Sequence, residues 1–424
     1  MTSLYTRNNA ALWLGIVICG LASLFYIYDY FVQVAPSIMT QELMGAFHID
    51  AESLGALGSC FFITYTIMQI PAGMLLDRWG ARKMLTMATL ISALGVVLFS
   101  MANHLWLAEF SRGMIGFGSA FAFLSTVFLI SRWFKHQYFA FLIGFLQFAG
   151  ALGSISGQGP LALLIDHEGW RLATLWIGVA GVVLSMLFLL IIRDDPAKEK
   201  SQVAALSDEK GSLRQVFRNA QVWWVAICGY VAWAPASGLV ALWGVPFVMH
   251  AYHLQNYQAG SLFTIFWLVV GVGGPVVGWF SDKIQRRKLP IALGFLIGVV
   301  SSAALLLGAG HYSLWVIGAL LFLLGVAVSV QSLTFGVIKD LVPGNRFATA
   351  SGLNNMITVF SGAMLQPLIG WLLTRQWDGQ KLDGTPIYSV HAYQVALSVI
   401  PIVMLIGFLV AVFLVKETYC QKQV

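Results

Sequence analysis

The stretch GMLLDRWGARK, residues 73–83, places four charged side chains between two apolar runs. Charge is scarce elsewhere, because only 10% of the residues in the chain are charged. A second stretch, GWFSDKIQRRK at 278–288, repeats the pattern. The residues that match at one constant offset are Gly73 and Gly278, Asp77 and Asp282, Arg82 and Arg287, and Lys83 and Lys288. This repetition predicts that the chain consists of two related halves.

The composition indicates a membrane protein. Hydrophobic residues make up 58% of the chain and the mean hydropathy is +0.80, whereas soluble domains contain roughly 45–50% apolar residues. Apolar runs of about 20 residues, the length that a helix needs to cross a bilayer, recur along the chain. They lie at 11–35, 54–76, 84–102, 106–131, 139–165, 170–192, 221–249, 258–280, 289–309, 313–338, 347–373 and 392–415.

These runs also predict the fold class. They are continuously apolar rather than alternating, so they indicate helices and not the strands of a barrel. We therefore expect an all-α integral membrane protein with twelve transmembrane helices, arranged as two pseudo-symmetric six-helix bundles. The longest polar segment divides the chain into an N-terminal bundle at 1–192, a cytoplasmic linker at 193–220 and a C-terminal bundle at 221–424.

Lysines and arginines predict the orientation in the membrane. With the N-terminus in the cytoplasm, twenty of the 24 lie in cytoplasmic segments and only three in outer loops. Cytoplasmic loops of membrane proteins carry such an excess of positive charge. Both termini are therefore expected in the cytoplasm, and the net charge of +6 reflects this topology rather than nucleic-acid binding.

Several motifs resemble those of the major facilitator superfamily. The residues similar to the family's signature loop between spans two and three are Gly73, Asp77, Arg78, Gly80, Arg82 and Lys83, with a weaker copy at Gly278, Asp282 and Arg287. In the fourth span, Arg112-x-x-x-Gly116-x-Gly118 is similar to the second motif. GSISGQGPLALL, residues 153–164, matches the family's antiporter motif only in part. The resemblance covers essentially the whole chain and implies a transporter.

The resemblance implies a gating role for the repeated loop. In that family the cluster holds the two halves together on the cytoplasmic side while the outer side is open. From the residues themselves, we expect Gly73 to permit close helix contact. We expect Asp77 to pair with neighbouring basic side chains or a helix N-terminus. The alternative is a plain positively charged anchor at the membrane surface.

Away from the ends of the expected spans only three residues are charged, namely Asp29, Glu109 and Arg112. At about 1.5 Å of rise per residue, Asp29 and Arg112 lie at similar depth in spans one and four, with Glu109 one turn above. In the facilitator fold both spans line the cavity of the N-terminal half, so we expect Asp29 to contact Arg112. Buried charges of this kind couple protons or hold an ionic solute, with a structural ion pair as the alternative.

Polar and aromatic residues are expected to line the same cavity. They are Tyr26, Tyr30, Gln33, Gln147, Trp233, Trp243, Gln331, Asn354 and Asn355. The first three share one helical face with Asp29. For each of them, packing between helices is the alternative.

The expected function is secondary active transport of a small polar nutrient by alternating access. YDYFVQVAPSIMTQELMGAFHID, residues 28–50, resembles the start of a facilitator branch that includes phagosomal nutrient importers and is related to lysosomal dipeptide transporters. That resemblance implies an amino acid, a short peptide or a nucleoside, and leaves proton-coupled import open. The alternatives are an organic-anion symporter or a drug exporter of the same fold, and a membrane sensor that does not transport.

Other classes of function find no support in the sequence. It contains no phosphate-binding loop, no nucleophile–base arrangement and no metal-ligand spacing, so we expect no enzyme, cofactor or metal site. The expected partners are a small-molecule substrate, protons and the lipid bilayer, without nucleic acid. We expect a monomer in a bacterial inner membrane.

Overall fold

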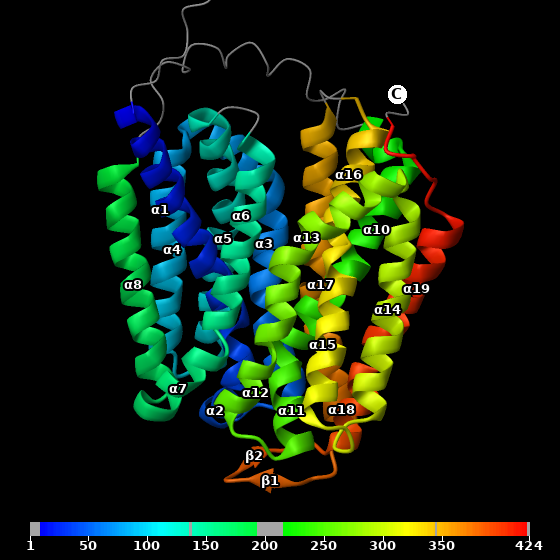
Figure 1. Ribbon diagram of the computed structural model, residues 1–424. Coiled ribbons are helices and arrows are strands. Elements are labelled where there is room, and N and C mark those ends of the chain that lie inside the picture. Colours follow the sequence, from blue (N-terminus) through cyan, green and yellow to red (C-terminus); the bar gives the residue numbers. More distant parts are fainter. Residues whose placement is uncertain (1–8, 135–137, 193–214, 344–345, 422–424) are drawn as a thin grey trace, which may run out of the picture.

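The computed structural model describes residues 9–134, 138–192, 215–343 and 346–421, and these residues are mostly helical (Figure 1). Twelve segments are helical, long and apolar enough to cross a membrane. This number confirms the predicted fold class. The predicted linker falls mainly on residues 193–214, which lie outside the described part of the chain.

The helices divide into two halves of six spans each. The N-terminal half consists of α1 (Asn9–Val34), η1 (Ala35–Ile38), α2 (Thr40–Phe47), α3 (Ala51–Trp79), α4 (Ala81–Met101), α5 (Leu105–Trp133), α6 (Phe139–Ser156), α7 (Gly159–Glu168) and α8 (Trp170–Ile191). The C-terminal half consists of α10 (Ala220–Ala234), η4 (Pro235–Trp243), α11 (Gly244–Tyr252), α12 (Asn256–Leu262), α13 (Thr264–Ile284), α14 (Lys288–Leu307), α15 (Leu314–Ser329), α16 (Gln331–Leu341), α17 (Phe347–Arg375), β1 (Lys381–Leu382), β2 (Thr385–Pro386), α18 (Val390–Leu397) and α19 (Val399–Phe413).

The two ends of the bundle differ. Both ends of the described chain lie at one end, which we call the terminal end (Figure 1). The short helices α2, α7, α11, α12 and α18 and the β1–β2 hairpin gather at the opposite end, which we call the far end (Figure 1).

Several spans consist of two helices rather than the one that an apolar run predicts. The fifth span changes from α6 to α7 around Gln158, whose backbone leaves the helical region at φ −116° and ψ −95°. The seventh span passes from α10 into the π-helical segment η4, which begins at Pro235. Because proline has no N–H to donate, it is compatible with such a change in helix geometry.

The two halves contact each other through α3 with α17 and α6 with α13. Small residues allow the close approach. A side chain at Gly370 of α17 would collide with the backbone of Ala51 at the start of α3. At the far end, one buried apolar cluster contains residues of both halves, such as Leu54 and Leu365. Two further clusters are centred on one half each. The halves are thus joined most firmly at the far end.

The backbone itself repeats between the halves. His48 (φ 53°) and His253 (φ 52°) end α2 and α11 in the left-handed conformation. Gly80 (φ 79°) and Gln285 (φ 53°) follow α3 and α13, also with positive φ. Both pairs keep the offset of the repeated loop, which agrees with the predicted pseudo-symmetry.

Candidate functional site

A cavity lies between the two halves. Its described lining consists of Tyr26, Asp29, Tyr30 and Gln33 from α1, Phe61 and Tyr65 from α3, Phe123 from α5, Gln147 from α6, Trp233 from α10, Gln331 and Phe335 from α16, and Asn355, Thr358 and Val359 from α17. The residues that were expected here and are brought together are Tyr26, Asp29, Tyr30, Gln33, Gln147, Trp233, Gln331 and Asn355.

Asp29 is the one charged residue in the described lining of this cavity. Its side chain is buried, at 1% exposure, and its Oδ1 atom accepts no hydrogen bond. A buried carboxylate oxygen without a hydrogen bond is unfavourable, although the Ser119 hydroxyl of α5 interacts with the same side chain. The oxygen is therefore placed to take a proton or a hydrogen bond from a bound solute. Among the residues that the structure describes, no cluster of His, Cys, Asp and Glu could hold a metal ion.

An aromatic wall adjoins Asp29 on α1. The Tyr26 hydroxyl donates to Gln147 Oε1 at 2.8 Å and lies 3.2 Å from the Tyr30 hydroxyl. The centroids of the Tyr26 and Tyr30 rings are 4.9 Å apart, and those of Tyr30 and Trp233 are 6.4 Å apart. Tyr30 and Trp233 belong to different halves, so this wall crosses the interface between them.

One hydrogen bond crosses the cavity on its terminal side. Asn355 Nδ2 of α17 donates to Gln69 Oε1 of α3 at 2.8 Å. The Nε2 atom of Gln69 is buried and has no partner. Gln69 was not among the expected site residues. The signal that could have identified it is helical spacing, because it follows Phe61 and Tyr65 at intervals of four residues.

Arg112 does not reach Asp29, which corrects the expected contact. Its Nη1 atom donates to the Val32 carbonyl at 2.9 Å, and its guanidinium lies 5.1 Å from the centroid of the Phe61 ring. Arg112 lines a separate cavity. Phe61, which belongs to the wall of the central cavity, packs against the Arg112 guanidinium. Arg112 thus contacts α1 three residues beyond Asp29, and an expectation of similar depth does not specify the direction of a side chain.

Three other expected residues also lie elsewhere. Glu109 lines a groove formed by α3, α4 and α5. Trp243 is buried and donates to the Gln366 carbonyl at 3.1 Å, while Asn354 is buried and donates to Thr334 at 2.9 Å. Each helical residue turns by about 100°, which explains why Asn355 reaches the cavity and Asn354 contacts α16.

Gln158 joins both halves at the helix break in the fifth span. It is 1% exposed, and its Nε2 donates to Ser37 Oγ at 3.2 Å and to the Val240 carbonyl at 3.0 Å. Its Oε1 accepts from Trp267 Nε1 at 3.0 Å. Nearby, Asn256 donates to the Ile38 carbonyl at 2.6 Å. These bonds join the two halves on the side of the cavity that faces the far end. The sequence indicated only a partial match to the antiporter motif around Gln158.

The first copy of the loop motif is a one-residue turn between α3 and α4. Gly80 occupies it at φ 79°, a conformation that glycine adopts without strain. Arg82 Nη2 donates to the Leu189 carbonyl near the end of α8, at 2.6 Å. Arg78 and Lys83 are exposed. The side chain of Asp77 lies outside the described part of the chain, so its pairing stays a prediction.

The close helix contact expected of Gly73 is not formed in this conformation. A Cβ atom at Gly73 would have no neighbouring heavy atom within 4 Å, and the same holds for Gly278. Both glycines therefore border open space in this conformation.

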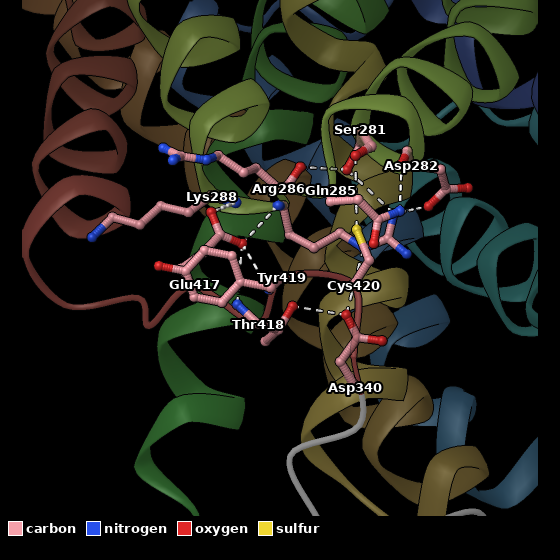
Figure 2. A network of polar contacts seen from close by, with 11 residues as sticks. Ser281, Asp282, Gln285, Arg286, Lys288, Asp340, Glu417, Thr418, Tyr419 and Cys420 are labelled. Atoms are coloured by element: carbon pink, nitrogen blue, oxygen red, sulfur yellow. Dashed lines mark hydrogen bonds and ion pairs between the residues drawn. The ribbon is translucent and has the colours of Figure 1, made fainter.

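The second copy of the motif carries a polar network of several side chains (Figure 2). Arg287 Nη1 lies 2.7 Å from Asp282 Oδ1, and its Nε lies 3.5 Å from Oδ2 of the buried Asp340. The Thr418 hydroxyl donates to the same Asp340 oxygen at 2.8 Å. Sequence reasoning missed Asp340, because nothing in its neighbourhood distinguishes it from a surface residue at the end of a span.

Glu417 connects the segment after α19 to the start of α14. Its Oε1 accepts the backbone N–H of Arg287 at 2.8 Å, and its Oε2 accepts that of Lys288 at 3.1 Å (Figure 2). A carboxylate is favourable at a helix N-terminus. The partners named for this network all belong to the C-terminal half. The latch between the halves stays a prediction for the state in which the far end is open.

Twelve spans in two pseudo-symmetric halves, with a polar cavity between them and one end sealed, form the architecture of an alternating-access membrane carrier. The chain belongs to the Major Facilitator Superfamily, whose family model matches residues 12–367 and 236–422. It is thus an integral membrane transporter of that superfamily.

Individual relatives agree with this assignment. The chain is 24% identical over 381 residues to the uncharacterized transporter YybO of Bacillus subtilis (strain 168), covering 84% of this chain and 86% of that protein. It is 24% identical over 420 residues to the probable L-galactonate transporter of Escherichia coli (strain K12), covering 92% and 87%. Its fold resembles a bacterial homologue of the human lysosomal transporter Spinster in an inward-facing, unoccupied conformation, with a TM-score of 0.78 at 16% identity, covering 94% of this chain and 97% of that chain.

Proposed function

We propose that this transporter imports a small polar nutrient, an amino acid, a short peptide or a nucleoside, together with a proton. The observation that carries the proposal is the burial of Asp29 in the cavity wall with one carboxylate oxygen unpaired. The protonated form avoids the cost of a buried charge, and hydration on opening favours release of the proton. The tyrosine hydroxyls of Tyr26, Tyr30 and Tyr65 are the other titratable groups in the described wall.

The same proposal places the terminal end in the cytoplasm of a bacterial inner membrane. The excess of lysine and arginine at the loops of that end supports it, and the relatives named above are bacterial. With this orientation the sealed far end faces outward, and the structure represents a state closed to the outside.

The test compares two carboxylates in liposomes that contain the purified protein. Asp29→Asn should abolish accumulation driven by a pH gradient while retaining counterflow exchange of the same solute, because exchange needs no net proton movement. Glu109→Gln is the matched control, since Glu109 lies outside the central cavity. It should retain both activities. Full pH-driven uptake by Asp29→Asn would contradict the proposal, and loss of coupling in Glu109→Gln would assign the proton to Glu109.

A further inference from the structure

We infer that the central cavity selects an uncharged solute with a flat face and several hydrogen-bonding groups, which among the three proposed classes means a nucleoside. The inference rests on the proposed function, because it names the solute of the same cavity. Three properties of the described cavity wall carry it, namely its charge, its free amide groups and its aromatic surface.

The first property is the absence of positive charge. No lysine, arginine or histidine occurs among the described residues that line the cavity. The guanidinium of Arg112 binds the Val32 carbonyl and belongs to a different cavity. Amino acids, peptides and sugar acids all carry a carboxylate at neutral pH. The carboxylate of such a solute would lose its water in this cavity without gaining a counter-charge from the described wall, which is strongly unfavourable.

Asp29 also disfavours a cationic solute in a proton-coupled importer. An amine bound to its carboxylate would compete with the proton for the same oxygen atoms. The two could then replace each other but could not travel together. An uncharged solute leaves Asp29 free to carry the proton, so it satisfies both the charge of the wall and the proposed coupling.

The second property is a set of free amides. Among the hydrogen bonds of the described residues, none involves the side chain of Gln33 or Gln331, although both line the cavity. Gln147 uses only its Oε1, as acceptor for Tyr26. Each free amide offers a donor beside an acceptor. This pair matches the adjacent acceptor and donor on the edge of a nucleobase, the geometry by which glutamine and asparagine bind adenine.

The third property is aromatic surface close to these amides. The Tyr26 and Phe123 rings lie 5.6 Å apart, and Tyr30 meets Trp233 edge to face at an interplanar angle of 82°. Flat bases bind proteins by stacking on such rings, while their edges take hydrogen bonds.

The first experiment uses pairs of solutes that differ by one charged phosphate group, with the purified wild-type chain. Binding is measured by calorimetry and by the melting temperature, and transport by uptake into liposomes. Adenosine or uridine should bind, raise the melting temperature and be taken up. The corresponding 5′-monophosphates should bind at least about 100-fold more weakly. Leucine, dialanine, glucose and L-galactonate complete the panel.

The second experiment reverses the charge of the wall. Gln331→Arg should improve binding of the monophosphate relative to the nucleoside by at least about tenfold. Gln394→Arg is the control, because Gln394 binds the Leu306 carbonyl within the C-terminal half and lies outside the described cavity wall. It should leave the ratio unchanged.

The outcomes separate this inference from the proposed function. Uptake of leucine, dialanine or L-galactonate without any nucleoside uptake would overturn the inference and leave transport intact. Uptake of glucose with no binding of nucleosides would overturn the requirement for a flat face. Nucleoside binding without flux of any solute would support the inference on the cavity and contradict the proposed transport.

Discussion

The two copies of the loop motif share a backbone turn but bind their neighbours with opposite chemistry. In the N-terminal half, the Arg82 side chain donates to the Leu189 carbonyl near the end of α8. In the C-terminal half, the Glu417 carboxylate beyond α19 accepts backbone N–H groups at the start of α14. Both contacts connect the last span of a half to its third. Pseudo-symmetry has therefore preserved the turn and the connection more closely than the side chains that make them.

The largest expected effect breaks the charged network of the second half. Arg287→Ala would leave Asp340, which is 6% exposed, without its cation. Removing one partner of a buried pair costs about 3–5 kcal/mol, whereas the exposed Arg82, replaced by Ala, should cost about 1 kcal/mol or less. The measurement is unfolding of both variants in detergent. Adding Asp340→Asn to Arg287→Ala should restore part of the loss, and equal losses for the two arginines would show that the halves do not differ.

The next effect concerns the hydrogen bonds that join the two halves at the far end. Gln158→Leu removes hydrogen bonds between the halves, each contributing about 1 kcal/mol. The population with the far end open should rise by about tenfold or more. Gln394→Leu is the control, because the Gln394 side chain donates to the Leu306 carbonyl within the C-terminal half at 2.8 Å. Spin-label distances across the far end measure both, and an unchanged distribution in Gln158→Leu would remove its role in closure.

The smallest expected effect tests the contact made by Glu417. Burial raises the pKa of the Cys420 thiol, while Arg287 acts in the opposite direction. A raised pKa leaves less thiolate at a given pH, so Cys420 should react slowly with a maleimide. Glu417→Gln weakens the attachment of the segment after α19 to the start of α14 by about 1 kcal/mol. This should expose the Cys420 thiol, lower its pKa and shift its reaction with the maleimide to lower pH. Cys420→Ser defines the background. Arg82→Gln should leave the rate unchanged, since it belongs to the other half.

The fold followed from patterns that are local in the sequence. Apolar runs located the spans, and the repeated loop identified two halves whose turns at Gly80 and Gln285 match in the structure. Helical spacing placed Tyr26, Asp29, Tyr30 and Gln33 on one face of α1, and all four line the cavity. Both successes depend on relations within one helix or at one constant offset.

The contacts that escaped prediction join segments far apart in the chain. Gln158 depends on a helix break that an apolar run does not reveal, and Glu417 depends on the course of the chain after its last span. Arg112 was expected to contact Asp29 but donates to the Val32 carbonyl. The rotation of one helix against another decides such contacts, and it is fixed by packing across the whole bundle.

The bond between Gln69 and Asn355 has a consequence for the role of water in transport. It crosses the terminal side of the cavity, and Gln69 Nε2 remains buried without a partner. If a solute leaves by this side, the pair must separate, and water must hydrate the amide groups that it uncovers. Solute release would then take up water molecules. We therefore expect an impermeant osmolyte on the terminal side to slow turnover, and Asn355→Ala to reduce that sensitivity.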